Sequence, residues 1–217
     1  MECRSALAVF AHPDDESFGL GAVLAQLVAE GIVVRALCFT HGEASTLGAT
    51  EDLGAVRAAE LAAAATVLGL EGAVVLDYPD GRLRAQPLSE LAGHVERQAR
   101  AGGADLLIVF DEGGVTGHPD HCQATAAALV AADRLGLAVL AWSVPDATAQ
   151  RLNAEFGTGF VGRTDREVDL VIDVDRQIQL RAIGCHQSQS CDNPVLWARL
   201  ALLEKREALR WLRRPAG

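Results

Sequence analysis

Short apolar runs alternate along this chain with longer, alanine-rich segments of helical character. The apolar runs at 6–11, 33–40, 74–76, 106–110 and 137–142 predict strands. The segments at 17–30, 54–70, 87–101 and 119–135 predict helices; Gly31 ends the first and Pro87 begins the third. Near-continuous apolar strands that alternate with helices are typical of a parallel sheet covered on both faces.

Right-handed crossovers between such strands give a doubly wound, mostly parallel α/β sheet of the Rossmann-like type, with helices on both faces. In the common strand order 3-2-1-4-5, the first and fourth strands are neighbours, and ligands bind outside their carboxyl ends. The rest of the chain predicts a strand at 168–174, a helix at 175–185 and a last helix at 194–213. We find no internal repeat or linker, so we expect one domain over residues 1–217.

The two loops at this predicted edge carry the same tripeptide. His12-Pro13-Asp14 follows the first strand and His118-Pro119-Asp120 follows the fourth, although the chain has only 6 histidines and 7 prolines. Proline followed by acidic residues begins a helix well, so helix capping alone would explain the prolines and aspartates. It does not explain His12, His118 and His121, because a cationic imidazole is disfavoured at a helix N-terminus.

A metal site explains the histidines and the acids together. A catalytic zinc takes about three His or carboxylate ligands and keeps an open position for water. His12, Asp15 and His121 supply such a set, and the adjacent Asp14 is the candidate general base for the water.

His118 precedes the ligand His121 by one helical turn and is the candidate group that faces a developing oxyanion. We expect Asp120 to hold His118 in one tautomer and to raise its pKa.

The two segments Ala11-His12-Pro13-Asp14-Asp15-Glu16 and Gly117-His118-Pro119-Asp120-His121 resemble the motifs of the PIG-L/LmbE-like zinc N-deacetylases. Further matching segments follow in order: Thr40-x-Gly42-Glu43, Arg57-x-x-Glu60, Leu76-x-Tyr78-Pro79-Asp80-Gly81 and His186-x-Ser188-Gln189. The resemblance therefore extends over residues 6–189.

This resemblance implies an LmbE-like fold and hydrolysis of an N-acetyl group on an aminosugar or a sugar-bearing small molecule. The pathway would be thiol-cofactor or natural-product biosynthesis, and the cofactor Zn²⁺. It implies the same ligands and general base as the residues alone, and it makes His118 the charged group that stabilises a tetrahedral intermediate. In the mycothiol branch a tyrosine stands two residues before the first histidine of the second motif; Thr116 stands here, which argues against that branch.

Three more residues are candidate substrate contacts through the resemblance: Arg57, Asp80 and His186. Each also has a simpler interpretation. Arg57 and Glu60 have the spacing of a helix-surface ion pair, Asp80 lies in a turn sequence, and His186 would fit a helix surface.

Two rival functions use the same residues. A non-haem iron enzyme binds Fe²⁺ through two histidines and one carboxylate. The adjacent Asp14 argues against it, because a carboxylate base serves water activation. A catalytically silent metal-binding protein is the other rival, and the presence of both Asp14 and His118 argues against loss of activity.

Charge and hydropathy limit the partners. With 29 acidic and 19 basic residues and no basic block, the chain does not predict a nucleic-acid binder. Asp133 and Arg134 interrupt its longest apolar stretch, so we expect no membrane insertion, and no signal peptide is recognisable, which favours the cytoplasm.

The five cysteines lack a CxxC motif and predict free thiols. The apolar face of the expected last helix covers the sheet in our preferred interpretation, although the resemblance also allows a homo-oligomer.

Overall fold

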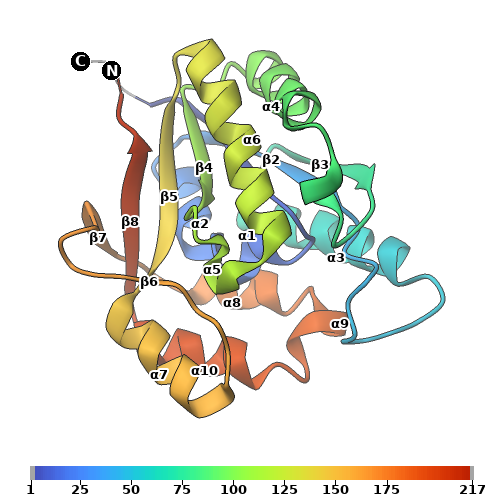
Figure 1. Ribbon diagram of the computed structural model, residues 1–217, viewed down its shortest axis with the longest axis vertical. Coiled ribbons are helices and arrows are strands. Elements are labelled where there is room, and N and C mark those ends of the chain that lie inside the picture. Colours follow the sequence, from blue (N-terminus) through green and yellow to red (C-terminus); the bar gives the residue numbers. More distant parts are fainter. Residues whose placement is uncertain (1–2, 216–217) are drawn as a thin grey trace.

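The computed structural model describes residues 3–215, and these form an eight-stranded sheet in the order β3-β2-β1-β4-β5-β8-β7 (Figure 1). The strands are β1 (Ser5–Phe10), β2 (Val33–Thr40), β3 (Gly72–Tyr78), β4 (Leu106–Phe110), β5 (Ala138–Pro145), β7 (Leu170–Asp173) and β8 (Arg206–Arg213); the short β6 (Gly162–Arg163) pairs with β5. The first five strands are parallel and have the expected order, which confirms the doubly wound α/β fold.

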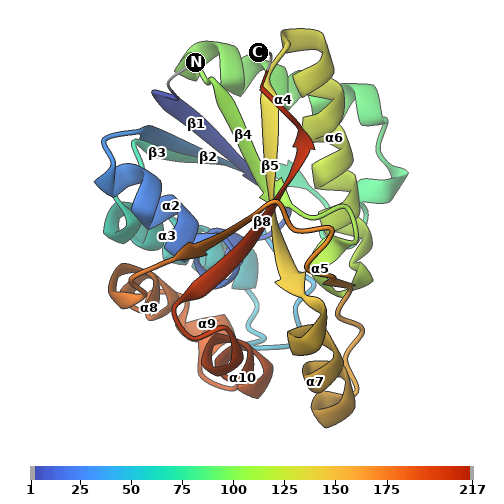
Figure 2. The same ribbon diagram turned by 90° about the vertical axis from the view of Figure 1, so that its left-hand side faces the viewer.

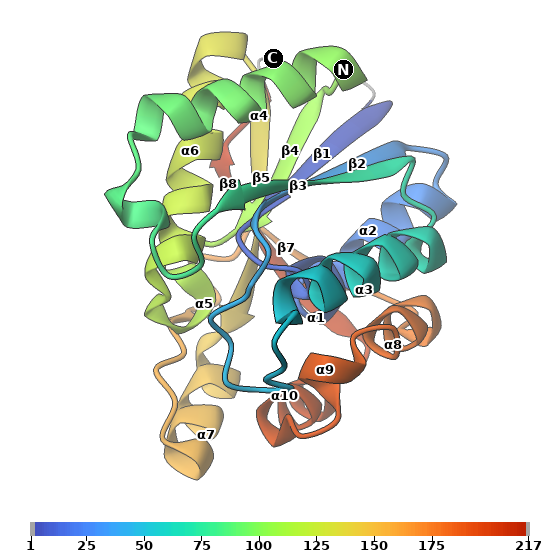
Figure 3. The same cartoon turned by 90° about the vertical axis from the view of Figure 1, so that its right-hand side faces the viewer.

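Helices cover both faces of the sheet, as Figure 3 shows. The helices α4 (Leu88–Gly102) and α6 (Pro119–Leu135) lie on one face, and α2 (Gly21–Ala29), α3 (Leu53–Leu68) and α8 (Gln177–Ile183) on the other. Along β1, Ala8 and Phe10 belong to the core under α2 and α3, whereas Leu7 and Val9 belong to the core under α4 and α6. Successive side chains of a strand point to opposite faces, so a strand buried on both sides is apolar throughout.

The predicted helix at 17–30 is two helices, α1 (Asp15–Phe18) and α2. The chain passes very close to Phe110 between them, because a Cβ on Gly19 would lie 2.3 Å from that ring. The remaining helices are η1 (Leu83–Ala85), α5 (Gly114–Gly117), α7 (Asp146–Phe156), α9 (Gln187–Ser190) and α10 (Pro194–Leu203). The sequence pattern had not indicated α7.

The predicted last helix at 194–213 is wrong in its second half. The helix α10 ends at Leu203, and β8 follows as an antiparallel strand between β5 and β7 (Figure 2). Local propensity in this segment favours a helix, but the free edge of β5 offers a full ladder of hydrogen bonds and a buried face. Glu207 is buried there and accepts a hydrogen bond of 2.7 Å from Trp142 Nε1. Trp211 therefore lies in a strand and is not part of a helical apolar face.

The parallel pairing of β1 with β4 places the loops after Phe10 and Phe110 side by side at the carboxyl edge.

All five cysteines are free. Within residues 3–215, every helix is too short or too polar to cross a membrane.

Candidate metal centre

His12, Asp15 and His121 meet at this edge from three different elements. His12 follows β1, Asp15 begins α1 and His121 lies in the first turn of α6. His12 Nδ1 lies 3.1 Å from His121 Nε2, which lies 3.2 Å from Asp15 Oδ1; His12 Nδ1 and Asp15 Oδ2 are 3.7 Å apart. Ligand bonds of about 2.1 Å in a tetrahedron separate the ligand atoms by roughly 3.4 Å. The spacing therefore fits three ligands of one ion.

Contacts on the far side of each ring indicate which ring nitrogen faces this point: a hydrogen bond for His121 and two carboxylates for His12. His121 Nδ1 lies 3.1 Å from the carbonyl oxygen of Gly114, which only accepts, so its Nε2 carries the free lone pair. His12 Nε2 lies 3.0 Å from Asp80 Oδ1 and 3.7 Å from Asp120 Oδ2, which leaves Nδ1 as the free lone pair. Metal-bound histidines are usually oriented by a carbonyl or carboxylate on the far nitrogen. Two lone pairs and a carboxylate that converge repel one another unless a proton or a metal cation lies between them.

The electrostatics also favour a cation. Burial acts to lower the pKa of His12, but the neighbouring carboxylates of Asp120 and Asp80 and the charge of Asp15 outweigh it and raise that pKa to about 10. Burial acts to raise the pKa of Asp15, but the charge and hydrogen bond of His121 hold it well below its usual range. The residues present thus fit a divalent metal ion.

Two further groups of ligand-type side chains share His12 with this set: one adds His118 to His12 and His121, and the other joins His12 to Asp80 and Asp120. The Asp120 carboxylate is already occupied, since it accepts hydrogen bonds of 2.7 Å and 3.1 Å from the backbone N–H groups of Gly81 and Leu83. The Asp120 carboxylate therefore lies on the Nε2 side of His12, away from the point where the three ligand atoms meet.

His118 differs from the expectation. Its Nδ1 accepts a hydrogen bond of 3.2 Å from the backbone N–H of Asp120, so the ring caps α6 and a neutral imidazole carries its proton on Nε2. The Asp120 carboxylate turns toward His12 and makes no hydrogen bond to His118 within residues 3–215. Burial and the neighbouring histidines lower the pKa of His118; the charge of Asp120 acts to raise it, as expected, but is outweighed.

Asp14 lies next to the ligands in a strained conformation, with φ of 125°. Its backbone N–H donates to Glu16 Oε2 at 3.0 Å, and its Oδ2 lies 2.9 Å from Arg57 Nη2. Burial raises the pKa of Asp14 to about 6, although the charge of Arg57 opposes this. The backbone is thus held so that this carboxylate faces the same cavity as the ligands.

The three candidate substrate contacts lie in different places. Arg57 is buried and binds Asp14 and the carbonyl oxygens of Pro13 and Gly42. Asp80 lines the cavity beside His12. His186 is fully buried, 2.6 Å from a Glu16 oxygen, and does not line that cavity.

Sequence reasoning missed the role of Glu16. This buried residue lies between His186 and the backbone of Asp14. Its position as the last residue of the first motif was the available signal.

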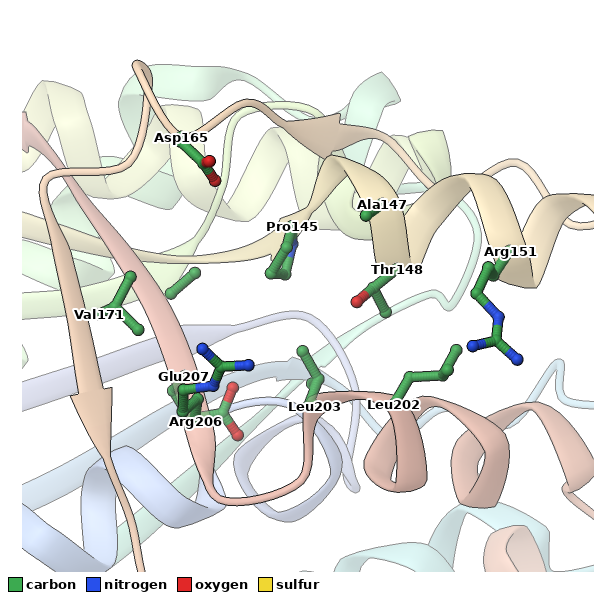
Figure 4. Close-up of a pocket in the computed structure, with 11 residues that line it drawn as sticks. Pro145, Ala147, Thr148, Arg151, Asp165, Val171, Leu202, Leu203, Arg206 and Glu207 are labelled. Atoms are coloured by element: carbon green, nitrogen blue, oxygen red, sulfur yellow. The ribbon is translucent and has the colours of Figure 1, made fainter.

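Two cavities adjoin the ligands and share only Asp15 and His121. One, of about 330 Å³, is mainly polar and is lined by His12, Asp14, Asp15, Ala44, Ser45, Arg57, Asp80, Gly81, His118, His121 and Gln189. The other, of about 190 Å³, is mainly apolar. A third cavity, of about 360 Å³, lies between α7, α10 and β8, where Figure 4 shows Thr148 and Arg151 opposite Leu202 and Leu203. It shares no residue with the metal centre.

The fold and the site define an α/β protein of the Rossmann-like type with a candidate metal centre of histidines and carboxylates at the switch point of its sheet. Residues 7–133 match the family described as PIG-L: GlcNAc-PI de-N-acetylase. The chain belongs to this family, as its two His-Pro-Asp motifs led us to expect.

Curated relatives carry related names. The chain is 36% identical over 157 residues to 1D-myo-inositol 2-acetamido-2-deoxy-alpha-D-glucopyranoside deacetylase of Streptomyces avermitilis, a match that covers 60% of this chain and 53% of that protein. It is 35% identical to deacetylase 1 of the same name from Catenulispora acidiphila, over 60% of this chain and 48% of that protein. The chain thus spans about half the length of the curated relatives it matches.

Solved structures share the fold. N,N'-diacetylchitobiose deacetylase from Pyrococcus horikoshii has a TM-score of 0.72 at 20% identity, with 98% of this chain and 85% of that chain covered. Teicoplanin deacetylase Orf2 has a TM-score of 0.74 at 18% identity, with 98% and 100% covered. GalB, the 4-carboxy-2-hydroxymuconate hydratase of Pseudomonas putida, has a TM-score of 0.74 at 16% identity, with 99% and 98% covered. At such identities the likeness shows the fold and leaves the reaction to the site.

Proposed function

We propose that this protein is a zinc-dependent hydrolase that removes an N-acyl group from an aminosugar or a sugar-bearing small molecule. The observation that carries the proposal is the position of His121 Nε2, which lies 3.1 Å from His12 Nδ1 and 3.2 Å from Asp15 Oδ1, with the Asp14 carboxylate beside these ligands in the same cavity. The names of the curated relatives, which are deacetylases of an acetamido sugar, support the substrate class.

A divalent metal bound by these three residues supplies Lewis-acid polarisation of a carbonyl group and activation of a water molecule. Two imidazoles, one carboxylate and an open position suit zinc, and ferrous iron accepts the same donors. Asp14 distinguishes the two chemistries, because a free carboxylate at this place serves proton transfer from water.

The side chains around the metal have separate roles in this proposal. Asp14 accepts the proton of the attacking water, and Arg57 keeps its carboxylate in place. His118 points its Nε2–H away from the helix cap and donates to the amide oxygen as negative charge develops there. Asp80 and Asp120 orient His12, so Asp120 acts behind the ligand in this proposal and not on His118. A proton must also return to the leaving amine, since an amine does not leave as an anion.

The polar cavity receives the sugar. Its volume of about 330 Å³ and its lining of Ser45, Asp80 and Gln189 offer hydrogen-bonding groups to hydroxyls.

We also infer that the chain acts as one domain, because elements from both ends of the sequence contribute to one sheet. The homo-oligomer stays a prediction, to be checked by light scattering.

The test is a screen of N-acetylated sugars and sugar conjugates with acetate release as the signal, together with elemental analysis. We expect Asp14→Asn to keep its metal and lose about two to four orders of magnitude in kcat. Asp15→Ala should lose both metal and activity. Asp77→Asn is the matched control, since that carboxylate is exposed and paired only with His41. Near wild-type turnover by Asp14→Asn would refute the mechanism, and undiminished metal in a His12→Ala/His121→Ala double variant would refute the site.

A further inference from the structure

The apolar cavity of about 190 Å³ beside the metal centre has no part in the mechanism above. Besides Asp15 and His121, its lining is mostly aromatic and aliphatic: Phe18, Gly19, Phe110, Val115, Thr116, Phe160, Asn193, Val195, Leu196 and Arg199. An amide held at the ligands between the two cavities would place its sugar in the polar one and its acyl group in the apolar one. An apolar cavity of about 150 Å³ holds benzene. This cavity is therefore larger than the methyl group of an acetyl requires.

One charged residue of this lining, Arg199, has no carboxylate partner within residues 3–215. Arg199 of α10 is 7% exposed, and its Nη2 donates to the carbonyl oxygen of Phe18 at 2.6 Å. Its Nε is buried without a hydrogen-bond partner, and no carboxylate within residues 3–215 forms a salt bridge with it. The oxygens of the nearby Glu207 are taken by Trp142 and Arg176. A buried guanidinium is normally paired, so Arg199 has capacity for an anion.

The groups around Arg199 leave its guanidinium charged and able to bind an anion. Burial lowers the pKa of Arg199 to about 10, which still leaves the group charged at neutral pH. Its guanidinium stacks at 5.2 Å over the ring of Trp142, which packs against Phe110, and Phe110 packs against His121. A ring face attracts a cation but accepts no strong N–H hydrogen bond. These ring contacts connect His121 to Arg199, and His121, Phe110 and Arg199 all line the cavity.

We propose that this cavity binds the acyl part of the substrate, and that the acyl chain ends in a carboxylate which pairs with Arg199. The proposal rests on the proposed function, since it assigns the acyl group that the hydrolysis releases. The substrate is then the monoamide of a short dicarboxylic acid. Water adds across the amide C–N bond and yields the free amine and the dicarboxylic acid, with no oxidant or reductant. The apolar lining contacts the methylenes between the two acid groups.

Direct binding tests the cavity without any turnover. Metal-loaded protein is titrated in a calorimeter with succinate against butanoate and with glutarate against pentanoate, pairs of equal length that differ in the terminal acid. One charge-assisted pair predicts roughly tenfold to a hundredfold tighter binding of the dicarboxylate. Arg199→Met should abolish the difference and Arg199→Lys should restore part of it. Arg151→Met, which removes an exposed arginine of α7 outside this cavity, should leave the difference unchanged. Equal affinities within both pairs for the unmodified protein would overturn the proposal, and this comparison needs no variant to fold.

Turnover separates this inference from the proposed function. We expect N-succinyl-glucosamine to be hydrolysed with a higher kcat/KM than N-acetyl-glucosamine, and the preference to reverse in Arg199→Met. Faster hydrolysis of the acetyl form by the unmodified protein would overturn the acyl assignment and leave the hydrolase standing. A dicarboxylate preference that depends on Arg199, without hydrolysis of either amide, would keep the anion site and refute the proposed function.

Discussion

Arg57 provides a direct test of how the structure holds Asp14. This arginine is 3% exposed and donates to Asp14 Oδ2 at 2.9 Å, to the carbonyl oxygen of Gly42 at 2.6 Å and to that of Pro13. Arg57→Met keeps a side chain of similar length but removes all three hydrogen bonds. It leaves a largely buried carboxylate without its cation and two carbonyl oxygens without their donor.

The expected cost follows from what is left behind. Breaking a buried ion pair by removing one partner typically costs about 3–5 kcal/mol, because the remaining charge is uncompensated. For a chain of this size each kcal/mol shifts Tm by about 2–4 °C, so Arg57→Met should melt about 6–20 °C below the parent protein. Activity should fall as well, since the carboxylate of Asp14 loses the contact that positions it.

The assay is thermal unfolding for the Tm and urea unfolding for the free energy, both followed by circular dichroism on metal-loaded protein, for Arg57→Met, Asp14→Asn and the double variant. An amide in place of the Asp14 carboxylate needs no counter-charge, so the double variant should be less destabilised than the sum of the single changes, with a coupling of at least about 1 kcal/mol. Additive effects, or a cost of Arg57→Met below about 1 kcal/mol, would show that this ion pair does not hold the loop as described.

Three further predictions concern individual residues. Gly42→Ala should destabilise the protein measurably in the same urea assay, because φ is +65° at this position and the new Cβ would lie 2.0 Å from Arg57 Nη1. Burial acts to raise the pKa of Asp111, but hydrogen bonds and the charges of two arginines hold it below its ordinary value; its stabilising effect is thus complete above about pH 4 and declines as the pH falls through the lowered pKa. Asp111→Asn should therefore unfold more readily than the parent at pH 7, and urea midpoints across pH should show the gap narrowing in acid. Asp120→Asn should weaken metal binding by roughly tenfold to a hundredfold through the loss of its hold on His12, as measured by competition with a chelator.

The sequence predicted the parts of the fold that a strong local pattern determines. The strand at Leu106–Phe110 and the helix at Pro119–Leu135 have the predicted bounds, because an uninterrupted apolar run and a proline-to-glycine boundary are local signals. The segment at Arg206–Arg213 was missed, since its strand form depends on the free edge of β5. A one-dimensional pattern does not contain that edge.

The candidate site shows the same division. His12, Asp15 and His121 come together as expected, because the switch point of a doubly wound sheet fixes which loops are neighbours. The partner of Asp120 was wrong, since its carboxylate reaches back across the loop to His12 and bonds the backbone after Asp80. Such contacts between loops depend on exact chain paths, for which residue types and spacing carry no signal.

The strand and helix at the carboxyl end have an evolutionary consequence. The match to the family ends at residue 133, and within it lie all three proposed ligands and Asp14. Part of the apolar cavity, including Leu196 and Arg199, comes from α10, which lies beyond that match and is anchored by β8. Under the acyl assignment proposed above, mutations in this later segment change which acyl group is accepted while the proposed reacting groups are inherited unaltered.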